Sequence, residues 1–198
     1  MPTGTKLALA NTLKGLLQKK SLDDITVKEI VEGCDVNRQT FYYHFQDIFD
    51  LLCWLLEHET ALAISAASNW QEMLLSACRY IQENHLIVNH IARSNGRVYL
   101  EELFYQLTRN MMSDLLDARA GDLALAEYDR DFLLDFYMYA LTGMVSGWFY
   151  RDMREDPEAL VARIAQLVNG GLRESAHAFC ATPPSPSNLE TKCTGEGV

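Results

Sequence analysis

Proline is almost absent from the first four-fifths of the chain. Only five of the 198 residues are proline, and the next one after Pro2 is Pro157. Because proline removes a backbone donor and breaks helix interiors, residues 3–156 can form a succession of uninterrupted helices. The 48% of hydrophobic residues are ample for a buried core. We therefore expect an all-α fold.

The cysteine and histidine patterns of disulfide frameworks and metal centres are also missing. The cysteines are odd in number, widely spaced and free of any Cys-x-x-Cys pair, and the N-terminus has no secretory signal pattern. They are Cys34, Cys53, Cys78, Cys180 and Cys193. We interpret them as reduced thiols of a cytoplasmic protein, with a redox role for Cys34 as the alternative to a small core residue. The five histidines do not recur at metal-ligand spacing, so no metal or cofactor is expected.

Membrane spans and catalytic signatures are not found either. The longest uncharged apolar run, residues 136–150, has 15 residues, whereas a bilayer needs about 20. No phosphate-binding glycine loop, nucleophile elbow or zinc helix motif occurs. The sequence therefore predicts neither a membrane protein nor an enzyme.

Basic residues are few, and their distribution is uneven. The formal net charge is −10, which counts against nucleic-acid binding because such binding normally needs a basic surface. Residues 1–20 nevertheless carry four lysines and no acid, and residues 1–50 sum to −1. The remaining 148 residues carry −9. A near-neutral N-terminal region on an acidic body remains compatible with specific, salt-sensitive DNA binding.

The N-terminal region contains two short predicted helices, each with its own start signal. Thr26 and Glu29 have the spacing of a capping box, and the helix they begin ends near Gly33. Asn37 is an N-cap residue, and Val36 and Phe41 flank it at the spacing of a hydrophobic staple. The few residues between the helices require a steep crossing, as in a helix-turn-helix motif.

The second of these helices predicts a face suited to base edges. If Phe41 and Phe45 point inward, then Arg38, Gln39, Thr40, Tyr43 and His44 point to solvent, and all five can donate hydrogen bonds. Gln39 can pair with adenine and Arg38 with guanine, while Thr26, Tyr42 and His44 can reach phosphates. The predicted DNA-binding set is Thr26, Asn37, Arg38, Gln39, Thr40, Tyr42, Tyr43 and His44. A polar surface helix of an all-helical protein is the alternative.

The run VNRQTFYYHF, residues 36–45, resembles the recognition-helix signature of TetR-type bacterial regulators. An amphipathic helix precedes it, with Leu9, Leu13, Leu16 and Leu17, as in that family. Residues 47–59 and 70–84 resemble the fourth and fifth helices of the subgroup that activates dihydroxyacetone kinase genes. The resemblance covers residues 5–93 well and the rest loosely.

Four positions depart from the family pattern. Asp35 stands where the family often has glycine in the turn, although aspartate tolerates left-handed backbone better than most residues. Gln39 replaces a glycine of many relatives, so the operator bases cannot be carried over. Ile48 and Phe49 replace a charged pair, which suggests that this edge packs against an apolar surface.

The resemblance implies a three-helix DNA-binding domain over residues 1–46 and a helical sensing and dimerisation domain over residues 47–180. Residues 181–198, rich in Pro, Ser, Thr and Gly, predict a disordered tail. We expect helices over 47–68, 70–84, 86–93, 98–118, 126–151 and 157–179. Gly143 and Gly147 lie four apart on one helical face, which permits close approach of another helix. The last two helices are expected to form a four-helix bundle with those of a second copy, for which an intramolecular hairpin is the alternative.

The implied function is that of a homodimer that binds a palindromic double-stranded operator and responds to a small-molecule or protein effector. Repression is the common mode of regulation in this family. Activation of dihydroxyacetone kinase-type genes through a partner protein is a second possible mode. A helical interaction module without DNA binding is a third. Aromatic candidates for an effector pocket, each of which can equally be core, are Trp54, Trp70, Tyr80, Tyr105, Phe132, Phe136, Tyr139 and Trp148. Possible anchors for an anionic effector are Arg79, Arg93 and Arg97.

Overall fold

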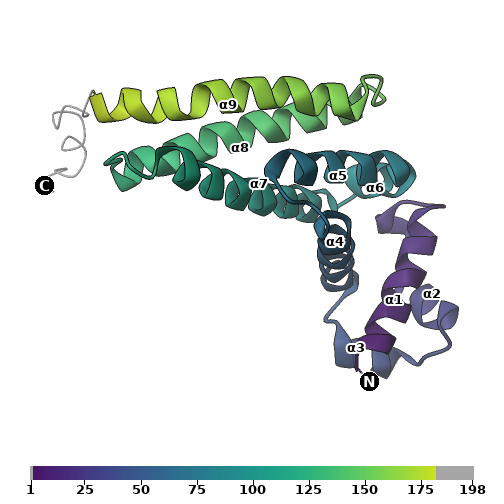
Figure 1. Ribbon diagram of the computed structural model, residues 1–198. Helices are drawn as coiled ribbons and strands as arrows, with labels where there is room; N and C mark the ends of the chain where they lie inside the picture. Colours follow the sequence, from purple (N-terminus) through teal and green to yellow (C-terminus); the bar gives the residue numbers. More distant parts are fainter. Residues whose placement is uncertain (1, 182–198) are drawn as a thin grey trace, which may run out of the picture.

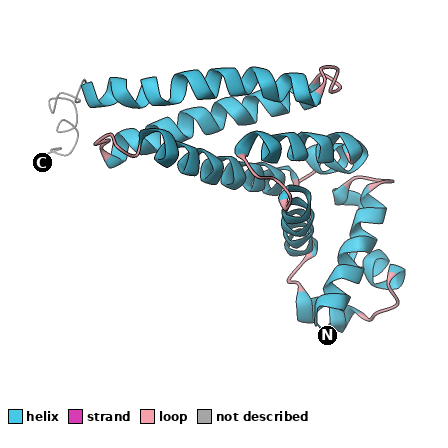
Figure 2. Cartoon of the chain, in the orientation of Figure 1, coloured by secondary structure: helices cyan, strands magenta, loops and turns pink. Residues whose placement is uncertain are grey.

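The computed structural model describes residues 2–181, and within that range the chain forms helices and no strand (Figure 2). The expected all-α class is confirmed. The helices are α1 (Pro2–Leu17), α2 (Val27–Gly33), α3 (Arg38–His44), α4 (Ile48–Ile64), α5 (Trp70–Glu83), α6 (His85–Ala92), α7 (Arg97–Ala120), α8 (Glu127–Tyr150) and α9 (Pro157–Ala181), with a 3₁₀ turn, η1 (Leu22–Asp24), between α1 and α2.

The helices form a long body with a smaller head at one end (Figure 1). The three longest helices, α7, α8 and α9, pack against one another, and α5 packs against α9. Helix α4 leads from the body to the head, which consists of α1, α2 and α3 (Figure 1). The far end of α9 lies well away from the head, so the two ends of the molecule can serve different purposes.

Two hydrophobic cores hold this arrangement together. The first joins α1, η1, α2 and α3 to the beginning of α4, with Leu51, Leu52, Leu55 and Leu56, and to Ile87 and Ile91 of α6. The second is built from α5, α7, α8 and α9. The first core continues past residue 46 into α4 and α6. The domain boundary predicted at residue 46 therefore divides the chain by expected function, while the apolar packing is continuous across it.

Most helices begin and end close to the predicted residues, but the helix predicted over 47–68 is shorter. Helix α4 ends at Ile64, where the Ser65 hydroxyl donates to the Leu62 carbonyl at 2.8 Å. Asn69 then caps α5 by accepting the Glu72 amide at 2.9 Å. Serine and asparagine side chains compete with the helical ladder in this way, which explains why the alanine-rich stretch does not continue as helix.

The predicted tail, residues 181–198, lies outside the described residues except for Ala181, which ends α9.

Candidate nucleic-acid interface

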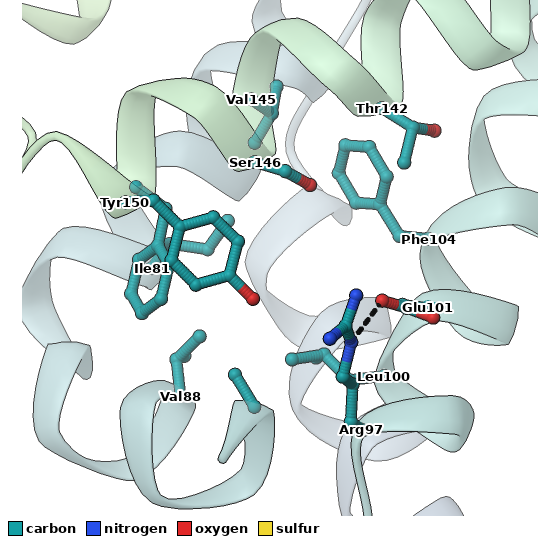
Figure 3. Close-up of a pocket in the computed structure, with 12 residues that line it drawn as sticks. Ile81, Val88, Arg97, Leu100, Glu101, Phe104, Thr142, Val145, Ser146 and Tyr150 are labelled. Atoms are coloured by element: carbon teal, nitrogen blue, oxygen red, sulfur yellow. Dashed lines mark hydrogen bonds and ion pairs between the residues drawn. The ribbon is translucent and has the colours of Figure 1, made fainter.

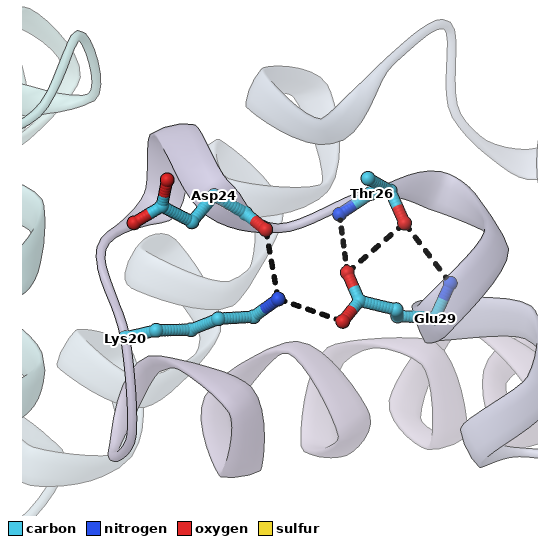
Figure 4. Close-up of polar contacts among 4 residues, drawn as sticks. All are labelled: Lys20, Asp24, Thr26 and Glu29. Atoms are coloured by element: carbon cyan, nitrogen blue, oxygen red, sulfur yellow. Dashed lines mark hydrogen bonds and ion pairs between the residues drawn. The ribbon is translucent and has the colours of Figure 1, made fainter.

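Helix α2 begins at a complete capping box. Thr26 Oγ1 accepts the Glu29 amide at 3.3 Å, and the Glu29 carboxylate accepts the Thr26 amide at 3.0 Å. Lys20, just beyond the end of α1, donates to Glu29 Oε1 and to the Asp24 carbonyl, each at 2.7 Å (Figure 4). The bond from Lys20, followed by those from Thr26, lowers the pKa of Glu29 to about 2. The Thr26 side chain, although exposed, is thus engaged within the motif.

The turn between α2 and α3 depends on one left-handed residue and one close approach. Asp35 has a φ of 53°, a region that glycine adopts most readily, so the expectation for this residue is confirmed. The Val36 amide donates to the Val31 carbonyl at 3.0 Å and closes the end of α2. A Cβ at Gly33 would lie 2.5 Å from Thr12 Cγ2, so a larger residue there would have to displace the Thr12 side chain of α1.

Helix α3 is capped by Asn37 as predicted. The side-chain oxygen of Asn37, Oδ1, accepts the Thr40 amide at 2.8 Å and the Thr40 hydroxyl at 3.0 Å. Phe41 and Phe45 are buried in the first core, and Val36 packs against the same cluster. These contacts fix which side of α3 faces the protein, and therefore which side remains outside.

The outer side of α3 presents hydrogen-bonding groups to solvent. Arg38, Gln39 and Tyr43 are exposed as predicted, and 83% of Tyr43 is accessible. Tyr42, predicted as a phosphate contact, is also exposed.

Two members of the predicted face are only half-exposed, which corrects the expectation that all five point freely to solvent. The Thr40 hydroxyl donates to Asn37, and the His44 ring lies edge-on to Tyr43 with 4.9 Å between centroids. Thr40 is therefore held by the helix cap, and His44 packs against a neighbouring aromatic ring of α3.

The lysines near the N-terminus are partly used inside the protein. Lys14 pairs with Glu59 of α4, and Lys20 pairs with Glu29. Lys6 lies 5.2 Å from the centroid of the Phe45 ring. Within residues 2–181, Arg38 makes no ion pair, so its guanidinium is available on the exposed face of α3. The positive charge counted from the sequence therefore overstates the charge that is available to bind a DNA phosphate.

The head is tied to the body by hydrogen bonds and by a close contact between Gly96 and the Leu22 side chain. Asp23 accepts the Asn95 amide at 3.1 Å, and His90 Nδ1 lies 2.7 Å from the Leu17 carbonyl. Since a carbonyl only accepts, Nδ1 carries the proton of this bond. A Cβ at Gly96 would lie 2.5 Å from Leu22 Cδ2, so the corner between α6 and α7 fits closely against the head.

The edge at the start of α4 is apolar, as its sequence suggested. Phe49 stacks on Tyr99 of α7 with ring centroids 5.4 Å apart, and Ile48 packs against the first core. The departure from the family's charged pair is therefore explained by a contact with the body.

The predicted effector-pocket aromatics fall into different environments. Trp70 and Trp148 are buried in the second core, where the Trp148 indole donates to the Glu155 carbonyl at 2.7 Å. Trp54 stacks on His58, with centroids 4.9 Å apart. Phe132, Phe136 and Tyr139 are exposed on α8. Tyr105 is half-buried and lines neither of the two hollows between α5, α6 and α7.

Among these aromatics, Tyr80 does line a cavity. Two adjoining hollows of about 80 and 60 Å³ lie between α5, α6, α7 and α8, with α4 closing the smaller one beside Tyr80. Arg97 lines the larger hollow (Figure 3), whereas Arg79 pairs with Glu158 and Arg93 lies on an open surface groove. Residues such as Phe104 and Val145 were not predicted, because apolar residues at helical spacing look the same whether they fill a core or line a cavity.

A second unusual surface lies on α8 and α9. Large apolar side chains are exposed on these helices, namely Tyr128, Phe132, Phe136 and Tyr139 on α8 and Leu167 on α9. Gly143 lies on the exposed surface of α8, and a Cβ added there would meet no atom within 4 Å. Contacts within the protomer therefore do not explain this glycine.

Both the head and the body match known protein families. A family described as "Bacterial regulatory proteins, tetR family" matches residues 12–52, and one described as "Transcriptional regulator C-terminal region" matches residues 68–170. The chain is 34% identical over 90 residues to the HTH-type dhaKLM operon transcriptional activator DhaS of Lactococcus lactis subsp. lactis (strain IL1403), covering 44% of this chain and 48% of that protein. The aligned part thus spans about half the length of this curated relative.

Solved structures share the fold. A dihydroxyacetone kinase operon activator DhaS superposes with a TM-score of 0.66 at 23% identity, covering 86% of this chain and 97% of that one. A TetR transcriptional regulator from Streptococcus agalactiae 2603V gives 0.65 at 21% identity, covering 84% and 94%. In the described range, no helix has the length and apolar character to cross a membrane. The two family matches, the second over about half of the chain, show that this protein belongs to the tetR family of bacterial regulatory proteins.

Proposed function

We propose that this transcriptional regulator binds a palindromic operator as a homodimer, with α3 of each protomer in a major groove. The observation that carries the proposal is the outward face of α3, where Arg38, Gln39 and Tyr43 are exposed on a helix fixed by Asn37 and Phe41. A rigid helix with exposed donors is what reading base edges requires.

Within this face we assign different roles to different residues. Gln39 and Arg38 read bases, because their planar groups can make two hydrogen bonds to adenine and to guanine. Tyr42, Tyr43 and His44 contact the sugar-phosphate backbone or neighbouring bases. Asn37, Thr40 and Thr26 act mainly by positioning the two helices, since their side chains are engaged in the caps.

The proposed dimer uses the exposed face of α8 and α9. Its aromatic side chains would lose their contact with water in a second copy, and Gly143 would let two α8 helices approach closely. A two-fold axis through this face would also place two heads at one end, as a palindrome requires. An intramolecular hairpin alone would leave the apolar face exposed.

The direction of regulation, activation or repression, has less support in the structure than DNA binding has. The relative's name describes an activator of the dhaKLM operon. We therefore propose activation of dihydroxyacetone kinase-type genes, signalled by a partner protein, as a second version beside repression released by a small molecule. A reporter placed behind the operator distinguishes them, because deletion of the regulator raises expression in one case and lowers it in the other.

The test of DNA binding is selection from random duplexes by the full chain at low and moderate salt. We expect an enriched palindrome whose half-sites are about one helical turn apart. A matched Arg38→Ala, Gln39→Ala variant should lose the enrichment while keeping its fold, because both side chains are exposed. If no sequence is enriched at low salt, the chain is a helical interaction module and the proposal is wrong.

A further inference from the structure

The paired hollows in the body have one chemically distinct end. Ile81, Val88, Leu100 and Phe104 line both hollows and form the apolar part between them. The polar side chains of Arg97, Glu101, Ser146 and Tyr150 line the larger hollow (Figure 3), whereas the hydroxyl of Thr142, another lining residue, donates to Met138 Sδ on its own helix. A space with an apolar interior and a polar end suits a molecule with the same division.

Arg97 and Glu101 are the two charged residues that line the larger hollow, and both side chains are more than half exposed. Arg97 Nε donates to Glu101 Oε1 at 2.6 Å, so the pair is held by one nitrogen of the guanidinium. Within residues 2–181 the two terminal nitrogens make no hydrogen bond to protein, and Figure 3 shows the Tyr150 hydroxyl directed toward them across the hollow. Two parallel N–H groups of arginine match the two oxygens of a carboxylate, and a hydroxyl can add a third donor.

The size of the hollows limits the rest of the molecule. At about 80 and 60 Å³ they are together close to the roughly 150 Å³ cavity that accommodates benzene. An apolar body of about six carbons therefore fits if Leu100 and Phe104, which line both hollows, adjust to join them.

We propose that this cavity binds a small carboxylic acid with an apolar body of about six carbons, whose carboxylate pairs with Arg97. The inference rests on the proposed function for its regulatory meaning, since the acid would act as the effector. The net charge of −10 repels anions in general, so a preference for acids over alcohols must come from Arg97 locally.

A route from the cavity to the head is present in the structure. Tyr80 lines the smaller hollow, and the Lys14 ammonium lies 5.8 Å from the centroid of its ring. Lys14 belongs to α1 and pairs with Glu59 of α4. An acid that displaces Tyr80 therefore disturbs the contact between α1 and α4, and with it the position of α3.

Isothermal titration calorimetry on the full chain tests the ligand class. The probes are butanoate, hexanoate, octanoate and phenylacetate, each compared with its primary alcohol. We expect hexanoate and phenylacetate to bind more tightly than their alcohols. Arg97→Met should weaken the acids about tenfold and leave the alcohols unchanged, because a charge-assisted pair at a partly exposed site is lost. Glu101→Gln should strengthen the acids several-fold, because the competing carboxylate is removed.

Arg163→Gln is the matched control, since Arg163 forms a similar exposed pair with Glu155 outside the cavity. Acids that bind no better than alcohols, or equally well to wild type and Arg97→Met, would overturn the inference, as would no binding of any probe. Folding of each variant is checked by thermal unfolding.

The regulatory meaning is tested separately, by measuring affinity for the selected operator with and without hexanoate. A change in wild type that is lost in Arg97→Met supports the effector role, and an unchanged affinity excludes it. If no operator is selected at all, the proposed DNA function fails while the calorimetric result still stands.

Discussion

The outer face of α3 and the outer face of α8 both expose aromatic side chains, yet their neighbours differ. Tyr42 and Tyr43 on α3 are 58% and 83% exposed, much like Phe136 and Tyr139 on α8 at 58% and 66%. On α3 the rings stand beside Arg38 and Gln39. On α8 they stand beside Ala140 and Gly143.

This difference indicates two kinds of partner. Planar groups with several donors suit the polar edges of bases and the charge of phosphates. Small residues between aromatic rings suit an apolar helix that approaches closely. Such a surface offers few hydrogen bonds to a partner, so only apolar packing can stabilise the contact. Exposed aromatic residues alone therefore do not identify a binding surface, whereas the residues between them do.

The largest effect is expected from a charge placed in the α8 face. Gly143→Arg should convert the dimer to a monomer, because two guanidinium groups would meet near the two-fold axis. The protomer should fold normally, since a Cβ at this position meets no atom within 4 Å. Operator affinity should fall about 100-fold or more as the second half-site is lost. Sedimentation velocity and operator titration measure both effects.

Ala118→Arg, on the exposed surface of α7, is the control and should remain dimeric. A dimeric Gly143→Arg protein would show that the α8 face has another use and would break the contrast with α3.

A smaller effect that sharpens the contrast is expected on α3 itself. Gln39→Ala should reduce discrimination at one base pair of each half-site by about 1–3 kcal/mol, because the bidentate contact to adenine is lost. Tyr42→Phe should weaken binding to all sequences alike by about 1 kcal/mol, since it removes one hydroxyl and keeps the ring against Phe41. Site selection with both variants measures the difference. Equal loss of discrimination in both would contradict the division between base and phosphate contacts.

The turn that presents α3 should respond to a change of backbone preference. Asp35→Ala should destabilise the head by about 1–2 kcal/mol, because alanine tolerates the φ of 53° poorly. Asp35→Gly should retain or improve stability, since glycine adopts this region without steric cost. Chemical unfolding and operator binding distinguish the pair. We expect no change in dimerisation, since the α8 face is remote from this turn, and a shift in oligomeric state would contradict the separation of the two surfaces.

The smallest effect concerns the pH dependence of the capping box. The folded-state pKa of Glu29 is about 2, below its usual 4.5, so its ionised form stabilises the fold above the usual value. That contribution is lost as the pH falls from about 4.5 through about 2. Glu29→Gln keeps a capping side chain but removes the charge that faces Lys20.

We expect the difference in unfolding free energy between wild type and Glu29→Gln to be constant near neutral pH and to vanish toward pH 2. Gly143→Arg in the same titration should show no such change, because its effect depends on dimerisation. A difference that persists at pH 2 would mean that the charge of Glu29 is not what stabilises α2.

Local features of the head were predictable because they join residues close in sequence. The cap at Thr26 uses Glu29 three residues later, and the cap at Asn37 uses Thr40. Each bond depends on backbone geometry within one helical turn, so residue types at fixed spacing are sufficient. The end of α4 differs from the prediction because alanine favours helix, and the polar groups that stop it, Ser65 and Asn69, lie within and just after the alanine-rich stretch.

Features that join distant segments were decided by the tertiary structure. Two of the four lysines counted as basic surface are paired, and one of them, Lys14, pairs with Glu59, 45 residues away. Phe136 and Tyr139, candidates for a pocket, lie outside the core, while Phe104 and Val145 line the cavity. The sequence alone determined most of the helices, the caps at Thr26 and Asn37, and the side of α3 that carries Arg38, Gln39 and Tyr43, because short-range bonds define them. Which apolar residues became core, cavity or exposed surface was decided only when long helices packed side by side, since burial depends on neighbours that no local spacing specifies.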